Sequence, residues 1–268
     1  MTTEEKYEKL KIYIKDLGAA AVAFSGGADS SFLLKVAHDV LGADAAAITA
    51  RSDIFPQRET EEAVSFCSSE GIKQLFCDFN EQTLEGFIQN SPDRCYLCKK
   101  ELFSRIVKTA QDCSIPHIID GTNADDTGDY RPGLKALDEL NIKSPLKEAG
   151  LTKDEIRSLS KKLNLVTWDK PSAACLASRI PYGDLITKEK LNMIDQAESY
   201  LSDLGLKQRR VRCHGSLARI ETDDEGFEII TDKKNRKAVA AKMKQLGFLY
   251  SSADLTGYRT GSLNDPIK

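Results

Sequence analysis

The chain has 268 residues and a net charge of −3, with 41% hydrophobic and 29% charged residues. This length suits one large domain or two ordinary ones, and the composition is that of a globular protein with its own core. No apolar run approaches the length that spans a membrane, and the Glu- and Lys-rich residues 1–11 do not read as a signal peptide. A cytoplasmic location without membrane contact is therefore expected. The acidic balance disfavours nucleic acid as a partner.

The first half alternates helical and strand patterns. Apolar positions at helical spacing predict an opening helix over residues 3–17. The elements expected after it are strands over 19–24, 45–50, 74–79 and 117–120, and helices over 31–40, 58–70, 96–111 and 154–163. Such alternation is typical of an α/β fold with a doubly wound, mostly parallel sheet. Ligands of these sheets bind outside the carboxyl ends of the strands, where the polar turns at Ser25, Arg51 and Gly121 are expected.

The pattern changes in the second half. Residues 168–183 contain Pro171 and Pro181 and show no clear period, which favours an ordered loop between two domains. The elements expected beyond it are helices over 188–204 and 233–246, and strands over 209–213, 218–221, 227–230 and 248–251. They describe a smaller α+β unit. The expected domains are therefore residues 1–170 and 171–268.

The string Ser25-Gly-Gly-Ala-Asp-Ser30 follows a predicted strand and opens a predicted helix. Gly26 and Gly27 let the backbone approach an anion closely, and a helix N-terminus supplies free N–H groups and the positive end of the helix dipole. Ser25 and Ser30 can add hydroxyl donors, and Asp29 can hold the Mg²⁺ that accompanies ATP. A glycine turn whose Asp or Ser only caps the helix is the alternative. The whole string in a strand–loop–helix context favours phosphate binding.

This string resembles the SGGxDS loop of the PP-loop ATP pyrophosphatases, which include NAD synthetase, GMP synthetase and the tRNA thiolases. No Walker sequence GxxxxGK[ST] occurs. The resemblance implies that ATP is cleaved between its α- and β-phosphates. An oxygen of the substrate is adenylated, pyrophosphate leaves, and a nitrogen or sulfur nucleophile displaces AMP. A loop of backbone donors suits this chemistry because it stabilises the charge of the leaving pyrophosphate.

A second polar turn, residues 120–126, follows the fourth predicted strand and reads DGTNADD. Its position at the ligand-binding edge of the sheet favours a role for Gly121 and Asp125 in binding ATP. Asp125 and Asp126 could hold a second face of the magnesium ion or orient the nucleotide. A turn that caps the next helix is the alternative.

Seven cysteines occur, and disulfides are not expected in a reducing compartment. Cys95-Tyr-Leu-Cys98 is a CxxC, which indicates metal ligation or redox chemistry. A zinc ribbon is disfavoured because there is no second CxxC and the three histidines are scattered. Cys175 lies between Lys170 and Arg179, whose charges favour a thiolate. Three thiolates could hold a 4Fe–4S cluster through three of its irons, although Cys175 could also be a packed small residue. The cysteines assigned to packing are Cys67, Cys77, Cys113 and Cys213.

Several strings together resemble the LarE family along nearly the whole chain. In order they are SGGADS, RCYLCKKELF, DGTNADD, GDYRPG, SPLKEAGLTKDEIR, KPSAACLASRIPYG and RVRCHGSLARIE. The resemblance implies an ATP-dependent sulfur transferase that adenylates a carboxylate of pyridinium-3,5-biscarboxylic acid mononucleotide and converts it to a thiocarboxylate, for a nickel-pincer nucleotide cofactor. One design in the family takes the sulfur from a loop cysteine, matched here by Cys175. The other uses a 4Fe–4S cluster on three cysteines, matched by Cys95, Cys98 and Cys175.

Arg210 and Arg212 alternate along a predicted strand and so share one face. Two guanidinium groups on one face suit a phosphate, and the LarE resemblance places this pair near the substrate phosphate, with Ser178 and Arg179 joining them. An exposed basic strand face is the alternative. Glu198 and Glu221 are possible acid partners of these arginines.

The same residues are compatible with three other functions. A tRNA thiolase would combine the same loop with three cysteines, an amide-forming synthetase would use ammonia, and a nucleotide sensor would bind ATP without releasing pyrophosphate. The small second domain, by family resemblance, implies a homo-oligomer, either a trimer or a hexamer.

Overall fold

The computed structural model describes residues 1–128, 132–171, 174–259 and 261–262. They form two compact units. The first comprises Met1–Ser52, Arg58–Glu81 and Asp93–Ala173, and the second comprises Asp53–Gln57, Gln82–Pro92 and Ala174–Lys268. Parts of two strings quoted above, residues 129–131 of GDYRPG and 172–173 of KPSAACLASRIPYG, lie outside the described residues.

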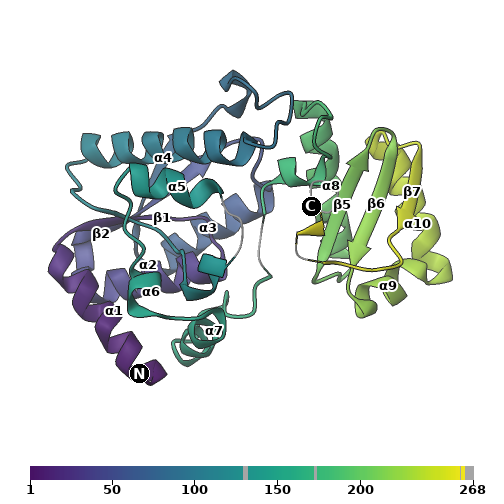
Figure 1. The fold of residues 1–268 in the computed structure, drawn as a ribbon. Coiled ribbons are helices and arrows are strands. Elements are labelled where there is room, and N and C mark those ends of the chain that lie inside the picture. Colours follow the sequence, from purple (N-terminus) through teal and green to yellow (C-terminus); the bar gives the residue numbers. More distant parts are fainter. Residues whose placement is uncertain (129–131, 172–173, 260, 263–268) are drawn as a thin grey trace. The chain divides into compact units, whose positions relative to one another are not determined.

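The first unit is built on a parallel sheet. Its strands are β1 (Ala20–Ala23), β2 (Ala45–Arg51), β3 (Lys73–Asp78) and β4 (Ile118–Ile119), in the order β3-β2-β1-β4. Strands β1 and β2 of this sheet are labelled in Figure 1. The central strand β1 pairs with β2 on one side and with β4 on the other, all in parallel. The chain therefore reverses its direction across the sheet between β1 and β4, and such a switch point is where ligands of this architecture bind. The α/β fold expected from the sequence is confirmed.

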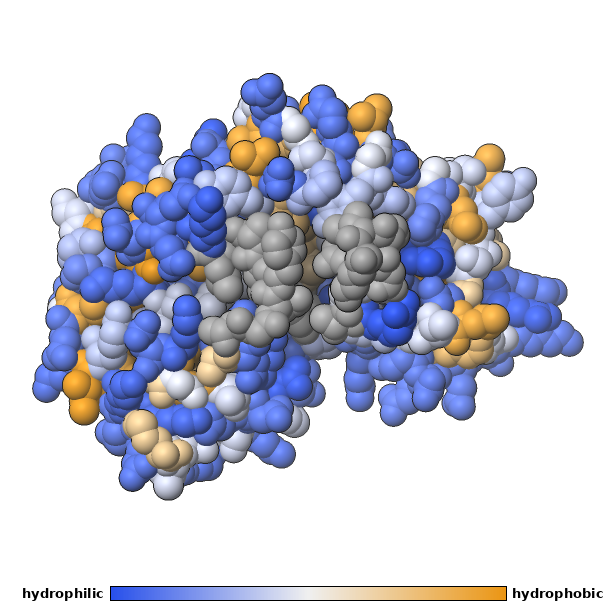
Figure 2. Space-filling model, viewed as in Figure 1, coloured by the Kyte–Doolittle hydropathy of each residue, from blue (hydrophilic) through white to orange (hydrophobic). Residues whose placement is uncertain are grey.

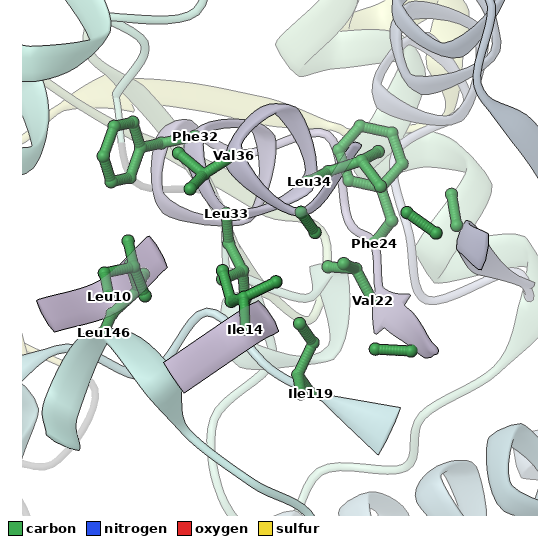
Figure 3. Close-up of a cluster of buried hydrophobic side chains, with 14 of the residues drawn as sticks. Leu10, Ile14, Val22, Phe24, Phe32, Leu33, Leu34, Val36, Ile119 and Leu146 are labelled. Atoms are coloured by element: carbon green, nitrogen blue, oxygen red, sulfur yellow. The ribbon is translucent and has the colours of Figure 1, made fainter. Parts of the chain in front are cut away.

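Helices cover both faces of this sheet. They are α1 (Thr3–Leu17), α2 (Ala28–Leu41), α3 (Gln57–Glu70), α4 (Arg94–Asp112), α5 (Pro132–Glu139), α6 (Pro145–Ala149) and α7 (Lys153–Lys162), with short 3₁₀ turns at η1 (Gly42–Asp44), η2 (Glu81–Thr83) and η3 (Ala124–Gly128). One apolar core contains Leu10, Ile14 and Val22, together with most of the buried side chains of α2 (Figure 3). Ala21, the neighbour of Val22 in β1, belongs to a second apolar core on the other face of the sheet, together with Phe103 of α4. Successive strand side chains point to opposite faces, so β1 is buried on both.

The second unit has a three-stranded sheet. Its elements are η4 (Leu176–Arg179), α8 (Lys188–Asp203), β5 (Arg209–His214), β6 (Leu217–Thr222), α9 (Asp224–Thr231), α10 (Lys233–Leu246) and β7 (Tyr250–Ala253). The strand order is β5-β6-β7, with β5 and β6 antiparallel and β6 and β7 parallel. The smaller α+β architecture expected for this part of the chain agrees with these elements.

The structure corrects several elements expected from the sequence. The strand expected over 227–230 is wrong, because these residues lie in α9. Asp223 caps this helix by accepting a hydrogen bond from the backbone N–H of Gly226, 2.9 Å away. A four-residue apolar run does not distinguish a strand from one turn of helix, and the cap decides it here. Helix α2 begins three residues earlier than expected, inside the glycine loop, and helices α5 and α6 were not predicted.

Hydrophilic residues predominate on the face drawn in Figure 2, and apolar residues occur there in small separate groups. Leu249, Tyr250 and Leu255 are exposed at the start of β7 and just beyond its end. Within the part of the chain that the structure describes, no helix is both long and apolar enough to cross a membrane.

Candidate active site

The glycine loop leaves the carboxyl end of β1 and leads directly into α2. Gly27 occupies the N-cap position with an extended backbone (φ −77°, ψ 166°), and no side chain caps this end of the helix. The first intrahelical bond from this cap runs from the N–H of Ser31 to the carbonyl of Gly27, at 2.9 Å. The N–H groups before it have no acceptor within the helix and carry the positive end of its dipole. This end of α2 is therefore suited to bind an anion.

Serine hydroxyls surround the same turn. The Ser30 hydroxyl donates to the carbonyl of Gly27 (3.2 Å) and lies 3.1 Å from the Ser25 hydroxyl. The Ser31 hydroxyl is fully buried and has no hydrogen-bond partner among the described residues. A buried hydroxyl without a partner costs about 1–3 kcal/mol. An acceptor delivered by a bound phosphate would remove that cost, so this hydroxyl fits a ligand at the loop.

Two glycines allow the loop to approach its neighbours. Gly26 has a positive φ of 72°, and a Cβ atom there would lie 3.1 Å from the Cβ of Ala63 in α3. Gly121, just after β4, would place a Cβ 3.1 Å from the backbone nitrogen of Ser30. Gly26 and Gly121, two of the three glycines predicted to bind ATP, therefore have a steric reason to be glycine. The turn after β4 lies against the N-terminus of α2, as expected for the switch point.

The substitution Gly26→Ala should lower both stability and nucleotide affinity. Gly71→Ala is a matched control, because Gly71 also has a positive φ, 67°, but has open space around it. The control should cost about 1–2 kcal/mol of unfolding free energy from the left-handed backbone alone. Gly26→Ala should cost about 1–3 kcal/mol more, because its Cβ must displace Ala63. Urea unfolding of both variants measures the difference, and equal losses would contradict the close contact.

Acidic residues lie beside the loop. The Asp29 carboxylate accepts a hydrogen bond from the Asn123 side chain, 3.2 Å away, and Asn123 donates its backbone N–H to Asp126 at 3.1 Å. Burial and, after it, the charge of Asp126 raise the pKa of Asp29. Asp125, in contrast to Asp126, is exposed, and its carboxylate accepts a hydrogen bond from the backbone N–H of Lys153 at the start of α7. Of the two adjacent acids considered for the magnesium ion, Asp126 thus lies near Asp29, whereas Asp125 is directed to the start of α7.

The pair Asp29 and Asp126 is suited to a divalent cation, which would relieve their repulsion. Asp29→Asn should therefore weaken Mg²⁺-ATP binding by at least about tenfold, the effect of losing a charged ligand.

In the absence of nucleotide, Asp29→Asn should be no less stable than the wild type. A raised pKa means that the folded state resists ionisation of Asp29. The stability of the wild type therefore falls as the pH rises from 3.8, the ordinary pKa of this carboxyl group, through its higher pKa in the folded protein. Calorimetry with ATP and thermal unfolding at pH 7 measure the two effects. A clear loss of stability would contradict the repulsion.

A lysine that was not predicted as a site residue also reaches the loop. The Lys170 ammonium donates to the carbonyl of Gly26 at 2.9 Å and pairs with the Glu62 carboxylate of α3 at 2.8 Å. Lys170 lies 144 positions after Gly26, and no local pattern links them.

The cysteine pair lies near the N-terminus of α4 in the first unit. Cys95 and Cys98 are three residues apart and partly exposed, so their sulfur atoms share one side of the helix. Arg94, only 2% exposed, donates to the Cys95 sulfur at 3.5 Å, and a cation there suits a thiolate. In the second unit, Cys175 caps η4 and is partly exposed. Among the described residues there is no group of three or more His, Cys, Asp or Glu side chains placed to hold a metal ion.

The other cysteines are less uniform than expected. Cys67, Cys77 and Cys213 are buried, and burial raises the pKa of Cys67 to about 12 and that of Cys77 to about 11. The assignment of these three thiols to packing is confirmed. It is wrong for Cys113, which is exposed because α4 ends there and the residue follows its last turn.

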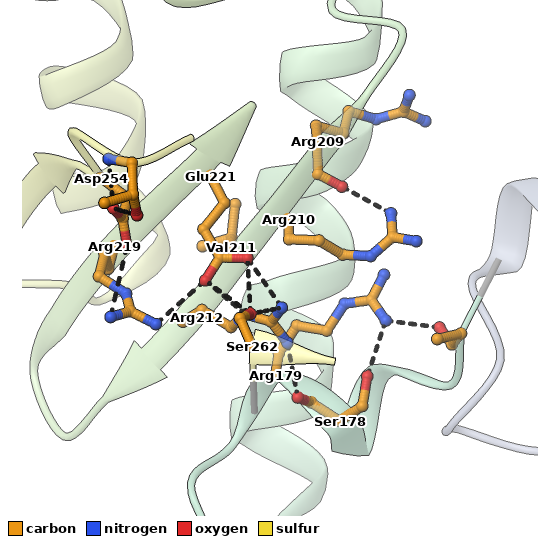
Figure 4. Close-up of polar contacts among 12 residues, drawn as sticks. Ser178, Arg179, Arg209, Arg210, Val211, Arg212, Arg219, Glu221, Asp254 and Ser262 are labelled. Carbon is orange, nitrogen blue, oxygen red and sulfur yellow. Dashed lines mark hydrogen bonds and ion pairs between the residues drawn. The ribbon is translucent and has the colours of Figure 1, made fainter. Parts of the chain in front are cut away.

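Arginines and glutamates form a buried network in the second unit (Figure 4). Arg179 makes two 2.9 Å bonds to Glu198, and Arg212 makes bonds of 3.0 and 2.8 Å to Glu221. Arg212 also donates to the backbone carbonyl of Ser178, which brings β5 and η4 together. The alternative of an exposed basic strand face is therefore wrong.

Three arginines of this network are buried close together. Arg179, Arg210 and Arg212 are each at most 8% exposed. Burial, followed by the charge of Arg179, lowers the pKa of Arg210. The predicted phosphate residues Ser178, Arg179, Arg210 and Arg212 thus lie together, and clustered guanidinium groups suit an anion because they offer forked hydrogen bonds.

Tyr96 and Trp168 are aromatic residues whose rings could stack on a planar ligand, and both have contacts within the first unit. The Tyr96 hydroxyl lies 2.9 Å from both carboxylate oxygens of Glu139, and the Lys161 ammonium lies 4.7 Å from the centre of the Trp168 ring. Neither contact indicates a free stacking face.

The parallel sheet, with SGGxDS and an uncapped helix N-terminus at its switch point, defines a nucleotide-binding enzyme of the PP-loop class. No family model matches the sequence. The chain is 36% identical over 270 residues to pyridinium-3,5-bisthiocarboxylic acid mononucleotide synthase of Lactiplantibacillus plantarum, covering 99% of this chain and 96% of the relative. It therefore belongs to the LarE family, the family of that synthase.

Other relatives agree with this assignment. An uncharacterized protein of Synechocystis is 41% identical over 261 residues, covering 97% of both chains. One subunit of the glutamine-hydrolysing GMP synthase of Methanocaldococcus jannaschii is 26% identical over 215 residues, covering 75% of this chain and 68% of the relative. This synthase subunit is of the PP-loop class that the loop predicted.

Proposed function

We propose that this chain is an ATP-dependent sulfurtransferase that converts a carboxylate of pyridinium-3,5-biscarboxylic acid mononucleotide to a thiocarboxylate, releasing pyrophosphate and AMP. The observation that carries the proposal is the uncapped N-terminus of α2 behind the SGGxDS loop, at the switch point of the parallel sheet. Such a site suits the phosphates of ATP. The name of the 36% identical relative supports the substrate.

The first unit would bind ATP. Ser25, Gly26, Gly27 and Ser30 would hold its phosphates through backbone N–H groups and hydroxyls, with Gly121 lying against them. Asp29 and Asp126 would hold the accompanying Mg²⁺. In this arrangement the substrate carboxylate attacks the α-phosphorus and pyrophosphate leaves. The loop and the metal would stabilise the charge that develops on the leaving group.

The second unit would bind the phosphate of the substrate nucleotide through Ser178, Arg179, Arg210 and Arg212. The burial of three guanidinium groups close together supports this role. Arg179 and Arg212 are each held by a carboxylate, so they would be in place before the substrate arrives, which reduces the cost of ordering them.

Cys175 would deliver the sulfur. In one route its sulfur attacks the adenylated carbonyl carbon and displaces AMP. Cleavage of the Cβ–S bond, with loss of the Cα proton, then leaves dehydroalanine in the chain and the sulfur on the product. In the other route Cys95, Cys98 and Cys175 would hold a 4Fe–4S cluster, which would supply a sulfide from outside the chain. The shared helix face of Cys95 and Cys98, and the guanidinium beside Cys95, support the second route.

The reaction is tested by incubating the protein with ATP, Mg²⁺ and the biscarboxylic acid mononucleotide. Pyrophosphate and AMP should form only when this substrate is present, and mass spectrometry should find one oxygen replaced by sulfur. Product containing ammonia-derived nitrogen, or pyrophosphate release driven by tRNA, would contradict the proposal. ATP binding without any pyrophosphate would indicate a sensor.

The sulfur route is tested by anaerobic purification and analysis of iron and acid-labile sulfide. The cluster route predicts about four irons per chain in the wild type, lost in Cys95→Ala, Cys98→Ala and Cys175→Ala. Cys113→Ala is the control, because Cys113 is exposed at the end of the same helix. No iron after reconstitution would leave Cys175 as the donor, and the protein would then lose the mass of one hydrogen sulfide on turnover.

We also propose that the chain assembles into a trimer or hexamer through residues 171–268. Strand β7 lies at the edge of its sheet, and its exposed residues, with Leu249 beside them, support an association there. Sedimentation of Tyr250→Lys and the wild type tests this contact, since a charge at an interface should dissociate the assembly.

A further inference from the structure

The phosphate loop carries no cation of its own. Residues 25–30 contain neither lysine nor arginine, whereas a Walker loop includes the lysine that contacts the phosphates. The charge that develops on a leaving pyrophosphate is best stabilised by a cation already in position. The loop therefore needs such a cation from another part of the first unit.

Lys170 reaches the loop from a distant segment. Its ammonium lies 2.9 Å from the carbonyl oxygen of Gly26, which places it on the loop backbone itself. The other contact, at 2.8 Å, is to the carboxylate of Glu62 in α3, the helix against which Gly26 packs. The Lys170 side chain is only 17% exposed, so its position is defined by these contacts rather than by solvent.

Two of the three ammonium N–H groups are used in these contacts, and a lysine has no acceptor to satisfy. The third N–H can meet a phosphate oxygen without breaking either bond. The Glu62 side chain is 47% exposed, so its pairing with Lys170 is screened by water and leaves most of the positive charge effective.

We propose that Lys170 binds the β- and γ-phosphates of ATP and stabilises the pyrophosphate as it leaves. This inference rests on the proposed function and adds a residue to its ATP site. Lys170 supplies the cation that the loop lacks.

The test is calorimetry of the full chain with Mg²⁺-ATP, with pyrophosphate and with adenosine. Lys170→Met and Lys170→Gln should each weaken ATP and pyrophosphate binding by about tenfold to a hundredfold, the effect of losing a charged hydrogen bond. Adenosine binding should stay unchanged, because adenosine has no phosphate. Lys170→Arg should restore part of the affinity. Lys170→Gln keeps a donor for the Gly26 carbonyl and so isolates the charge.

Two controls distinguish phosphate binding from a structural role. Glu62→Gln removes the ion pair but keeps the lysine, so it should bind ATP within about threefold of the wild type, as expected for an exposed pair. Lys162→Met removes a lysine from an exposed pair with Glu4 and should change nothing. Wild-type affinity in Lys170→Gln, or an equal loss in Glu62→Gln, would overturn the inference and leave the proposed function standing. Failure of the wild type to bind ATP would overturn both.

Discussion

Cys175→Ala is expected to abolish sulfur transfer while ATP binding and adenylation of the substrate continue. Both sulfur routes require the Cys175 sulfur, whereas ATP would bind to residues of the first unit. Loss of a nucleophile that works together with other catalytic groups lowers the rate by about 10³-fold or more. The measurement is product formed per chain by mass spectrometry, beside AMP and pyrophosphate in the same reaction.

The expected pattern for this variant is a slow release of AMP without thiocarboxylate, because water replaces the sulfur nucleophile. Cys113→Ala serves as the control, since this thiol is exposed and lies in the other unit. Normal product from Cys175→Ala would remove the cysteine from the mechanism. A loss of pyrophosphate release as well would show that Cys175 also supports adenylation.

Arg179→Met is expected to destabilise the protein strongly. Glu198 is buried, and it accepts two bonds from Arg179 and one from the backbone N–H of Val211. Without Arg179, a buried carboxylate would lose its main partner, which costs about 3–5 kcal/mol. Urea unfolding at pH 7 measures the change. Arg105→Met removes a partner of the partly exposed Glu101 instead and should cost no more than about 1 kcal/mol.

A second substitution separates charge from packing. Arg179→Met combined with Glu198→Gln should recover much of the lost stability, because no uncompensated charge stays buried. The pH dependence gives a further check. Burial alone would raise the pKa of Glu198, but Arg179 outweighs it and the net pKa is lowered from 4.5. The pair therefore stabilises the wild type above about pH 4.5, and this contribution is lost as the pH falls through the folded pKa. An equal loss in the single and double variants would contradict the charge argument.

Much of the first unit could be predicted from the sequence, because its signals are local. The run from Ala20 to Ala23 before SGGxDS predicts a buried strand and a glycine turn, and the structure contains both. Glycine at position 26 is explained by a positive φ. The alternation of Arg210 and Arg212 placed both on one strand face, since that depends only on the period of a strand. The LarE strings added the family, which the comparison with the L. plantarum synthase confirms.

Local signals were misleading where two structures compete for the same short run. The apolar residues of 227–230 suit one turn of helix as well as a strand, and the Asp223 cap decided for the helix. Cys113 resembles a packed thiol by its helical context, but the helix ends there and leaves it exposed.

Tertiary structure alone decided which charges meet. Asp125 and Asp126 are adjacent in the chain, yet only Asp126 influences Asp29, because the turn directs Asp125 to the start of α7. Lys170 meets Gly26 across 144 positions. The sequence by itself determined the phosphate loop, the parallel sheet and the family, all of which follow from short-range pattern. The ion pairs depend on how distant segments pack, and no local periodicity carries that information.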